Sequence, residues 1–445
     1  MVKNYGLLID GKWVENKKTL NVLNPFNQKK IASVSIASVA QIKNAIQNSQ
    51  YAFKKWSRIS VKDRSQILKN LFRIVKENKK SLSETITMES GKPISESMVE
   101  VDYGASFIEW AAEQSLGSYG KIFESPELDK KMFYIKKPVG VVAAITPWNF
   151  PLAMVTRKVA AAIAAGCSVI LKPSELTPLT ALKFGELSIE SGIPSGVFNI
   201  INGDAQLIGK LLTESSIVKK ITFTGSTKVG KLLMKNSSST VKNISLELGG
   251  NAPFIVFDDA NLDEALEGFI AAKFRNAGQT CISANRLFVN EKVFEKFQSM
   301  LVNRFKQLRV GNGFDDVDVG PLISNEALEK VESHIKDAAK KGAKLVFGGK
   351  RSDAGELFFE PTLVGNVNKQ MQIFKKENFG PIIPLVKFKS EKDLIELVND
   401  TEYGLAAYFY TKKTSRIWEI VENLVYGMFG VNSGKISTYL NPFGG

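Results

Sequence analysis

The sequence predicts an α/β protein with a doubly wound parallel sheet, a second α/β domain and a small β arm. From residue 139 onward, apolar strand-like runs alternate with helical stretches at spacings of roughly 23 to 29 residues, which fit βα units of a parallel sheet. A second alternation runs from about Asn251 to Phe429. The 445 residues, 44% hydrophobic and 23% charged, are enough for two or three domains with a large core.

The first 120 residues precede this alternation and consist of a hairpin followed by helices. The run Leu7–Val14 places Asp10-Gly11 between two apolar stretches, which is the signal of a tight β-hairpin. Ser38 and Gln41 form a capping-box pattern ahead of apolar residues at helical spacing. Two further helices are expected, over 62–77 and 95–117. The polar, irregular stretch 121–137 predicts a strand arm that leaves the domain.

The two alternations supply the remaining elements. Strands are expected over 140–145, 167–171, 197–201, 220–224, 244–246, 343–347, 382–388 and 406–410. Helices include 154–165, 179–191, 294–306 and 325–341. We assign residues 1–120 and 139–246 to one domain, 247–429 to a second, 121–138 to the arm and 430–445 to a return segment.

The composition excludes several classes of protein. The N-terminus, Met1–Gly6, lacks the apolar stretch of a signal peptide, and the longest apolar run, 159–171, is too short to span a bilayer. We therefore expect a soluble, cytoplasmic protein with no membrane partner. The net charge of +14 is scattered through amphipathic helices, without an arginine-rich tail, so no nucleic acid partner is expected. A positive surface also favours anionic ligands.

Cysteine and histidine are scarce in this chain. Two cysteines indicate no disulfide framework. The single histidine, His334, lies in the helical run 325–341 and is expected to be exposed. With one histidine, neither a His–Cys dyad nor a histidine-rich site is expected, and we predict no metal.

Cys281 has the surroundings of a nucleophile. It ends the loop Gly278-Gln279-Thr280-Cys281, whose glycine and small residues leave a thiol accessible. A thiolate attacks electrophilic carbon well once its pKa is lowered by a helix N-terminus or a nearby cation. Cys167 lies instead in an apolar run and is expected to be a buried small hydrophobe. A structural cysteine in a turn is the alternative for Cys281, and Glu247, 34 residues earlier, supplies a carboxylate.

Polar or punctuating residues follow the strands of the first alternation, where the ligands of such sheets bind. Asn149 is either a turn residue or an amide donor to an oxyanion. Lys172 with Glu175 either grips ribose hydroxyls or forms a charge pair at a helix entry. Gly225-Ser226 opens a helix whose N–H groups suit a pyrophosphate, although it lacks the P-loop and GxGxxG patterns.

Seven motifs, in one order over nearly the whole chain, make it resemble the NAD(P)-dependent aldehyde dehydrogenase superfamily. They are Thr146-Pro147-Trp148-Asn149-Phe150-Pro151, Lys172-Pro173-Ser174-Glu175, Phe223-Thr224-Gly225-Ser226, Glu247-Leu248-Gly249-Gly250, Gly278-Gln279-Thr280-Cys281, Glu377-Asn378-Phe379-Gly380-Pro381 and Asn441-Pro442-Phe443-Gly444-Gly445. The resemblance implies a doubly wound cofactor domain, an α/β catalytic domain and a β oligomerisation arm.

The same resemblance implies roles for these residues. Cys281 is the nucleophile, Glu247 the base that activates water, and Asn149 with the Cys281 backbone N–H the oxyanion hole. The implied cofactor-binding residues are Trp148, Lys172, Ser174, Glu175, Gly225, Ser226, Leu248, Glu377 and Phe379. A thiolate adds to the aldehyde, the oxyanion collapses with hydride transfer to the nicotinamide, and water cleaves the thioester. A carboxylate in a partly desolvated site can serve as the base of that last step.

The cofactor is expected to be NAD, with NADP possible. The Glu175 carboxylate can accept a hydrogen bond from a ribose 2′-OH and would repel a 2′-phosphate. Lys172 and Ser174 soften that repulsion, so use of both cofactors stays open.

Within the family, two segments resemble succinate-semialdehyde dehydrogenases, whose matching arginines hold the distal carboxylate of the substrate. These are Val155-Thr156-Arg157-Lys158 and Cys281-Ile282-Ser283-Ala284-Asn285-Arg286. Arginine suits this role because its planar fork binds a carboxylate bidentately. Arg157, Arg286 and Ser437 are thus the expected substrate-binding residues, and a structural ion pair is the alternative for either arginine. Ser283 stands where many such enzymes have a second cysteine, which excludes a disulfide there.

Three other functions compete with this interpretation. An acylating aldehyde dehydrogenase passes the acyl group to coenzyme A, but such enzymes typically lack the equivalent of Glu247. A binding protein that reuses the fold is disfavoured by the intact set of Cys281, Glu247 and Asn149. Glutarate semialdehyde remains an alternative substrate, since one methylene is worth only roughly 1–3 kcal/mol in a pocket.

The last motif, Asn441–Gly445, lies at the end of the given chain. In similar proteins a few dozen residues follow it, and their final strand joins the arm that pairs subunits. We therefore expect the chain to be an incomplete copy of a longer protein, or its assembly to be impaired. The complete protein is expected to be a homodimer or homotetramer.

Overall fold

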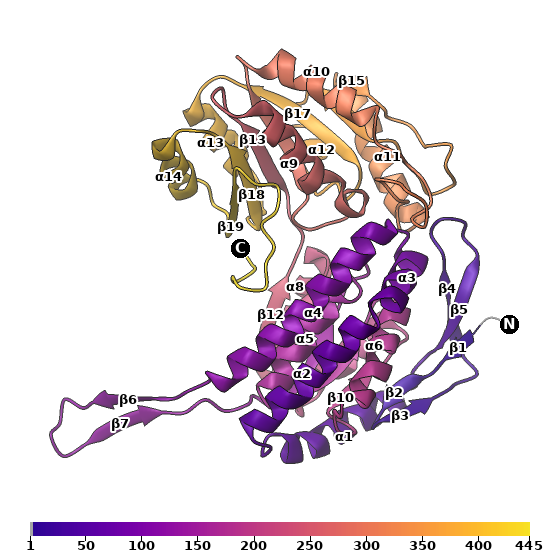
Figure 1. Cartoon of the computed structure of the whole chain (residues 1–445), viewed down its shortest axis with the longest axis vertical. Helices are drawn as coiled ribbons and strands as arrows, with labels where there is room; N and C mark the ends of the chain where they lie inside the picture. The colour runs from indigo at the N-terminus through magenta and orange to yellow at the C-terminus, as the bar shows by residue number, and fades with distance from the viewer. Residues whose placement is uncertain (1–2) are drawn as a thin grey trace. The chain divides into compact units, whose positions relative to one another are not determined.

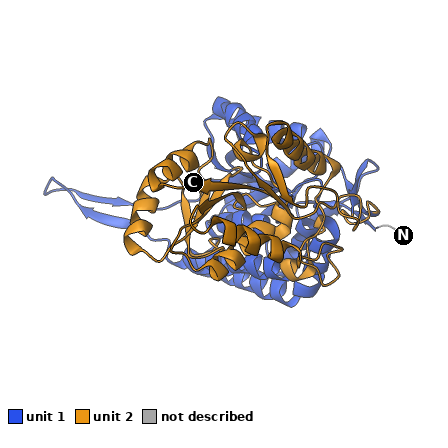
Figure 2. Cartoon of the chain, turned by 90° about the horizontal axis from the view of Figure 1, so that it is seen from above, with its two compact units in different colours: residues 1–23, 30–89, 98–247 blue, residues 24–29, 90–97, 248–445 orange. Residues whose placement is uncertain are grey.

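A computed structural model describes residues 3–445 and divides into two compact units. Figure 2 shows them in different colours. Unit 1 holds residues 1–23, 30–89 and 98–247, and unit 2 holds 24–29, 90–97 and 248–445. The chain passes from unit 1 to unit 2 directly after Glu247. The two candidate catalytic residues Glu247 and Cys281 therefore belong to different units.

Unit 1 is built on a seven-stranded sheet with the order β12-β11-β8-β9-β10-β2-β3. Its strands are β2 Leu7–Ile9, β3 Lys12–Val14, β8 Val141–Ile145, β9 Ser168–Lys172, β10 Phe198–Ile200, β11 Val218–Thr224 and β12 Asn243–Glu247. From β12 to β10 all neighbours are parallel, whereas β2 and β3 add an antiparallel hairpin at one edge. All five residues of β9 are buried, as expected for a strand covered on both faces.

Helices cover this sheet in two groups. They are α1 Val39–Trp56, α2 Val61–Glu77, α3 Lys79–Ser90, α4 Ile94–Leu116, α5 Ala153–Ala164, α6 Leu179–Glu190, α7 Ala205–Glu214 and α8 Thr227–Ser237, followed by the 3₁₀ turn Ser238–Thr240. In one group, α7 contacts both α1 and α8. In the other, α2 contacts both α5 and α6. Each Val, Leu or Ile buried between these layers contributes roughly 1.5–3 kcal/mol.

Two of these helices take their N-terminal caps from distant carboxylates. Neither α5 nor α6 has a side-chain cap of its own. The fully buried Glu89 accepts from the backbone N–H groups of Leu179 and Thr180, at 2.7 and 3.0 Å, at the start of α6. Glu100 accepts likewise from Leu152 and Ala153 at the start of α5. A carboxyl group at a helix N-terminus satisfies N–H groups that the helix itself cannot.

Two small sheets complete unit 1. One has the order β1-β5-β4, from Lys3–Tyr5, Lys30–Ser35 and Thr19–Leu23. The other is the two-stranded arm of β6 Lys121–Glu124 and β7 Lys131–Tyr134, which projects from the rest of unit 1 in Figure 1. Its apolar side chains are largely exposed: Ile122, Phe123, Leu128, Met132, Phe133 and Tyr134. A two-stranded ribbon alone is marginal in water, so these side chains form an apolar surface without cover in the described chain.

Unit 2 has a second seven-stranded sheet, with the order β15-β16-β17-β14-β13-β18-β19. Its strands are β13 Ala252–Val256, β14 Ala284–Asn290, β15 Lys344–Phe347, β16 Thr362–Gly365, β17 Ile382–Phe388, β18 Ala406–Tyr410 and β19 Met428–Val431. Its helices are α9 Leu262–Phe274, α10 Phe294–Phe305, α11 Asn325–Lys340, α12 Gln372–Lys375, α13 Glu391–Asn399 and α14 Thr414–Asn423. Only the β15–β16 pair is antiparallel among these strands.

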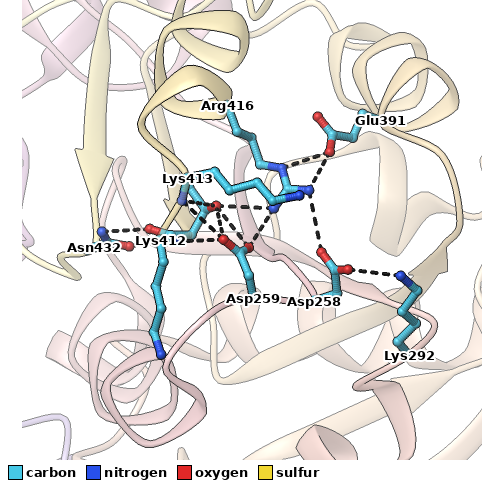
Figure 3. A network of polar contacts seen from close by, with 9 residues as sticks. Asp258, Asp259, Lys292, Glu391, Lys412, Lys413, Arg416 and Asn432 are labelled. Carbon is cyan, nitrogen blue, oxygen red and sulfur yellow. Dashed lines mark hydrogen bonds and ion pairs between the residues drawn. The ribbon is translucent and has the colours of Figure 1, made fainter.

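The carboxyl-terminal edge of this second sheet is filled by a network of charges (Figure 3). Arg416, on α14, donates to Glu391 and Asp259, and lies 3.4 Å from Asp258. Asp259 also accepts from the backbone N–H groups of Lys412 and Lys413 just beyond β18. The ligand edge of a parallel sheet is therefore occupied here by the protein's own ion pairs.

Most of the expected elements are present. The Leu7–Val14 hairpin and the Ser38–Gln41 capping box are confirmed. The prediction that His334 is exposed is wrong: its ring is 3% exposed on the inner face of α11. Among residues 3–445, no helix combines the length and apolarity that a membrane span requires.

Candidate active site

Cys281 lies in a tight loop between a 3₁₀ turn, Arg275–Gly278, and strand β14. The backbone of Asn276, Ala277 and Gly278 has positive φ angles of 52°, 55° and 77°, a left-handed run that costs free energy outside glycine. The buried side chain of Gln279 stabilises this left-handed run by hydrogen bonds. Its amide donates to the carbonyls of Asn276 and Pro321 at 3.0 and 3.3 Å. Cys281 itself stays partly exposed, as a nucleophile must.

The two glycines of the Glu247–Gly250 motif allow close contact between segments of unit 2. A Cβ on Gly250 would stand 2.1 Å from the carbonyl oxygen of Cys281, and one on Gly249 would stand 2.9 Å from the Glu377 carboxylate. The backbone N–H of Gly250 donates to Glu377 at 3.0 Å. A side chain at position 250 would displace the backbone of Cys281, so glycine is required there, and a side chain at position 249 would displace the Glu377 carboxylate.

Glu377 is a partly buried carboxylate between two lysines. Burial raises the pKa of its carboxyl, while the Gly250 N–H and the charges of Lys330 and Lys273 act to lower it. Lys273 is fully buried, and burial lowers its pKa to about 7. Within residues 3–445 its Nζ has no hydrogen-bond partner, and its backbone carbonyl accepts from Ser283 Oγ at 3.3 Å.

Arg275 and Cys281 lie near one buried phenol, that of Tyr408. Burial raises the pKa of Tyr408, the Arg275 charge lowers it and a Cys281 thiolate raises it further. The Tyr408 hydroxyl donates to the carbonyl of Ile282 at 2.7 Å. Arg275 and Cys281, six residues apart in sequence, thus both act electrostatically on this phenol in unit 2. A cation there stabilises a thiolate and can receive an anionic group.

The structure corrects the assignment of Arg286. Its side chain is 0% exposed, inside strand β14, and it donates to the carbonyls of Asn251 and Val398 and to the Tyr426 hydroxyl, at 2.8–3.2 Å. Burial also lowers the pKa of this guanidinium. An arginine so enclosed cannot hold a substrate carboxylate, because no ligand reaches it. The structural alternative describes Arg286.

In unit 1, Glu247 ends strand β12 beside two cations on helix α5. Burial raises the pKa of its carboxyl, and the charges of Lys158 and then Arg157 lower it. Lys158 is 8% exposed, its Nζ donates to Thr222 Oγ1 at 3.3 Å, and burial lowers its pKa to about 8. Arg157 is partly exposed and donates to the Tyr103 hydroxyl at 2.8 Å. A carboxylate of raised pKa next to a lysine suits a general base.

The carboxyl ends of the unit 1 strands carry the other predicted side chains. Lys172 ends β9 and pairs with Glu175 at 2.5 Å. Ser226 caps α8 with its side chain, and the Gly225 N–H donates to the Glu247 carbonyl at 3.0 Å. Two buried hydroxyls at this edge, those of Thr146 and Thr224, have no partner among the described residues. Orphaned hydroxyls at the strand ends, together with the N-terminus of α8, fit a dinucleotide.

The predicted residues therefore fall into two sets. Unit 1 holds Trp148, Asn149, Arg157, Lys172, Ser174, Glu175, Gly225, Ser226 and Glu247, and unit 2 holds Leu248, Cys281, Arg286, Glu377, Phe379 and Ser437. Asn149 and Ser174 are buried, and Ser437 is partly exposed in the segment after β19. Sequence reasoning missed Lys158, Lys273 and Arg275. Lys158 directly follows Arg157, and Arg275 precedes Cys281 by six residues. Their closeness in sequence to predicted site residues could have identified both.

Known proteins show close similarity over nearly the whole chain. A family model described as the aldehyde dehydrogenase family matches residues 13–445. The chain is 50% identical over 441 residues to the mitochondrial succinate-semialdehyde dehydrogenase of Oryza sativa subsp. japonica, covering 98% of this chain and 84% of that protein. It is 47% identical to the NADP(+) succinate-semialdehyde dehydrogenase GabD of Escherichia coli strain K12, covering 98% and 92%.

Two further similarities bear on substrate and fold. Identity is 46% over 440 residues to the glutarate-semialdehyde dehydrogenase of Pseudomonas aeruginosa, covering 98% of this chain and 91% of that protein. The crystal structure of succinate-semialdehyde dehydrogenase from Burkholderia pseudomallei superposes with a TM-score of 0.98 at 46% identity, covering 99% and 92%.

Proposed function

This chain belongs to the aldehyde dehydrogenase family, and from that premise we propose that it oxidises succinate semialdehyde to succinate with NAD as the preferred hydride acceptor. The observation that carries the choice of an acidic aldehyde is the partly exposed Arg275, six residues before Cys281, since both residues act electrostatically on the Tyr408 phenol. An arginine next to the nucleophile suits a substrate with a carboxylate.

Covalent catalysis begins at Cys281. Its thiolate adds to the aldehyde carbon, and the resulting oxyanion is held by the Asn149 amide and the Cys281 backbone N–H. The bound nicotinamide supplies the acceptor for the hydride that leaves this carbon. Cys281 then carries the acyl group as a thioester, which water cleaves.

Glu247 removes the proton from that water. Burial raises the pKa of Glu247, which makes its carboxylate a stronger base, and the charges of Lys158 and Arg157 act in the opposite direction. We assign Lys158 to the positioning and tuning of this base.

The distal carboxylate of the substrate is assigned to Arg157 and Arg275, with Ser437 as a further contact. Arg157 donates to the Tyr103 hydroxyl at 2.8 Å, and its guanidinium lies over the ring of Phe107. Arg275 takes the place that sequence reasoning gave to Arg286. A guanidinium group binds a carboxylate bidentately and forms no such pair with an uncharged chain.

NAD is preferred over NADP in this proposal because of Glu175. A carboxylate at this position would accept a hydrogen bond from a ribose 2′-OH and would repel a 2′-phosphate. The Lys172 ammonium, at 2.5 Å, offsets part of that charge, so NADP is accepted with lower efficiency.

Glutarate semialdehyde is the second candidate substrate, favoured by the 46% identity to an enzyme of that name. The deciding experiment measures NADH formation with succinate, glutarate and uncharged semialdehydes of matched length. Highest kcat/KM with succinate semialdehyde supports the proposal, whereas equal efficiency with an uncharged aldehyde contradicts a role for the two arginines.

We also propose that the enzyme is a homo-oligomer. The exposed apolar side chains of the β6–β7 arm, such as Ile122 and Phe133, provide the contact surface. Light scattering of the chain and of a variant with Ile122→Ser and Phe133→Ser tests this, with loss of the larger species expected in the variant.

A further inference from the structure

Three buried asparagines form a chain of hydrogen bonds at the amino-terminal edge of the unit 2 sheet. Asn251 precedes β13, Asn285 is the second residue of β14, and Asn378 follows Glu377. Asn285 Nδ2 donates to Asn251 Oδ1 at 2.5 Å, and the Asn378 backbone N–H donates to Asn285 Oδ1 at 2.9 Å. Asn378 Nδ2 returns a bond to the Asn285 carbonyl at 3.2 Å. None of the three is more than 2% exposed, so water does not compete for these bonds.

Both ends of this asparagine chain are anchored. At one end, Arg286 donates to the Asn251 carbonyl, and Asn251 Nδ2 donates to the Phe374 carbonyl at 3.1 Å. At the other end, His334 Nδ1 lies 2.9 Å from Asn378 Oδ1. Burial lowers the pKa of His334, so the neutral ring donates its Nδ1 proton to this amide oxygen.

Each asparagine lies next to a residue of the candidate site. Asn251 follows Gly250, whose N–H holds the Glu377 carboxylate. Asn285 lies four residues after Cys281, and Asn378 directly follows Glu377 in the chain. The asparagine chain therefore joins the three backbone segments that carry the thiol, the diglycine and the carboxylate.

We propose that Asn285 is a positioning residue that fixes the Glu377 carboxylate relative to the Cys281 segment. It is the one member of the asparagine chain that bonds to both others, and its Nδ2 also donates to the Lys376 carbonyl at 3.1 Å. Apolar residues would fill the same volume without the cost of burying amides, so the amides serve geometry. The inference rests on the proposed function together with the expectation, implied by the family resemblance, that Glu377 is a cofactor-binding residue.

The isosteric variant Asn285→Asp separates this role from packing. It keeps the acceptor for the Asn378 N–H but replaces the Nδ2 donor by an oxygen that faces Asn251 Oδ1 and the Lys376 carbonyl. The matched control is Asn290→Ala, on the same strand at its opposite end, where Oδ1 accepts only from the nearby Lys292 N–H at 3.1 Å.

The measurement is the Kd of NAD by protein fluorescence, with the melting temperature recorded for each variant. We expect Asn285→Asp to raise the Kd about tenfold or more, since a displaced binding group loses most of its contact. Asn290→Ala is expected to leave the Kd unchanged, whether or not the substitution lowers the melting temperature. A folded Asn285→Asp variant with the parent Kd overturns the proposal. Should Asn285→Asp not fold, His334→Leu removes the outer anchor and must raise the Kd in the same direction.

A double-mutant cycle with Glu377→Gln distinguishes the two levels of inference. If Asn285 acts through Glu377, the double variant binds NAD no more weakly than Glu377→Gln alone. An additive loss overturns the positioning role. An unchanged Kd in Glu377→Gln overturns the assignment of Glu377 to the cofactor, and with it this inference, whereas a raised Kd in that variant together with a silent Asn285→Asp overturns the positioning role alone.

Discussion

Lys172 and Glu175 form an ion pair at the carboxyl end of strand β9, with 2.5 Å between Nζ and a carboxylate oxygen. The lysine side chain is 6% exposed and the glutamate 51%. Burial acts to raise the pKa of Glu175, but the charge and hydrogen bond of Lys172 outweigh it and the net shift is downward. Glu175 is therefore ionised at neutral pH, as its proposed role in discriminating a ribose hydroxyl from a phosphate requires.

Replacing Glu175 should change the choice of cofactor. Glu175→Gln removes a charge that repels a 2′-phosphate and leaves Lys172 free to attract it, so we expect kcat/KM with NADP, relative to NAD, to rise about tenfold. Glu190→Gln, an exposed glutamate at the end of α6, is the control. A ratio of efficiencies unchanged in Glu175→Gln contradicts the role of this residue.

Cys281→Ala should abolish turnover and still bind NAD, because the nucleophile is lost but the dinucleotide residues are intact. Steady-state NADH formation and fluorescence titration with NAD measure the two properties. Cys167→Ala is the control, since this thiol is buried in unit 1 and should matter only for stability. Residual turnover in Cys281→Ala at the parent rate would remove the residue from the mechanism.

Glu247→Gln should separate acylation from hydrolysis. Hydride transfer needs no base at this position, whereas cleavage of the thioester needs an activated water. Rapid mixing should therefore show a burst of NADH followed by a weak steady state. A steady rate equal to that of the parent contradicts the assignment.

Arg275 and Arg286 should respond in opposite ways to substitution. Arg275→Gln removes one charge-assisted contact worth roughly 1.5–3 kcal/mol, so kcat/KM with succinate semialdehyde should fall about ten- to a hundredfold. The loss should be much smaller with an uncharged aldehyde of the same length. Equal losses on both aldehydes would assign Arg275 to structure.

Arg286→Met is the partner experiment. It leaves the carbonyls of Asn251 and Val398 and the Tyr426 hydroxyl without their donor, which should cost about 3 kcal/mol of unfolding free energy. Denaturant unfolding measures this cost. A selective loss of activity on acidic aldehydes, with unchanged stability, would restore Arg286 to the substrate site.

The pH dependence of hydrolysis should shift when Lys158 is replaced. Its charge lowers the pKa of Glu247 against the effect of burial. In Lys158→Met that pKa rises, so the ionised base is lost at a higher pH and the acidic limb of the steady-state rate moves upward. The NADH burst, which does not use Glu247, should keep its profile.

Stability provides an independent check on Lys158. Its pKa in the folded protein is about 8, below the 10.5 of an ordinary lysine, so folding disfavours the charged form. The resulting penalty is complete below pH 8 and is relieved as the pH rises toward 10.5. Lys158→Met should therefore lose the rise in melting temperature between these values that the parent shows.

Arg416 should matter for stability far more than its neighbour Lys292. Arg416→Met leaves Asp259 and Glu391 without their buried partner and should cost about 3–5 kcal/mol. Lys292→Met breaks an exposed pair with Asp258 and should cost about 0–1 kcal/mol. Urea unfolding compares the two, and equal costs would contradict the buried character of the network.

Local patterns explain why much of the fold could be predicted from sequence. A turn such as Asp10-Gly11 and a cap such as Ser38 act over a few residues, and the βα alternation repeats the same local rule. The caps that Glu89 and Glu100 provide could not be predicted, because each carboxylate lies 52 or more residues from the N–H groups it binds. Such long-range contacts leave no spacing in the sequence.

The arginines show the same limit at the site. Arg275 and Arg286 flank Cys281 at similar distances in sequence, and both carry the chemistry that a carboxylate requires. What separates them is the surrounding structure: β14 is buried along its whole length, whereas Arg275 begins an irregular turn with partial exposure. The prediction that His334 is exposed was wrong for a related reason, since its helix presents the ring to Asn378 and not to water.

Ser283 has a consequence for oxidative damage. Its hydroxyl donates to the Lys273 carbonyl at the place where many similar enzymes have a second thiol. If peroxide converts Cys281 to a sulfenic acid, the other cysteine of the given sequence, Cys167, is 3% exposed within unit 1 and is inaccessible as a resolving thiol. Recovery then depends on small thiols from solution, and without them oxidation proceeds to the irreversible sulfinic acid. Bound cofactor and substrate would cover the Cys281 sulfur and so protect it from oxidation.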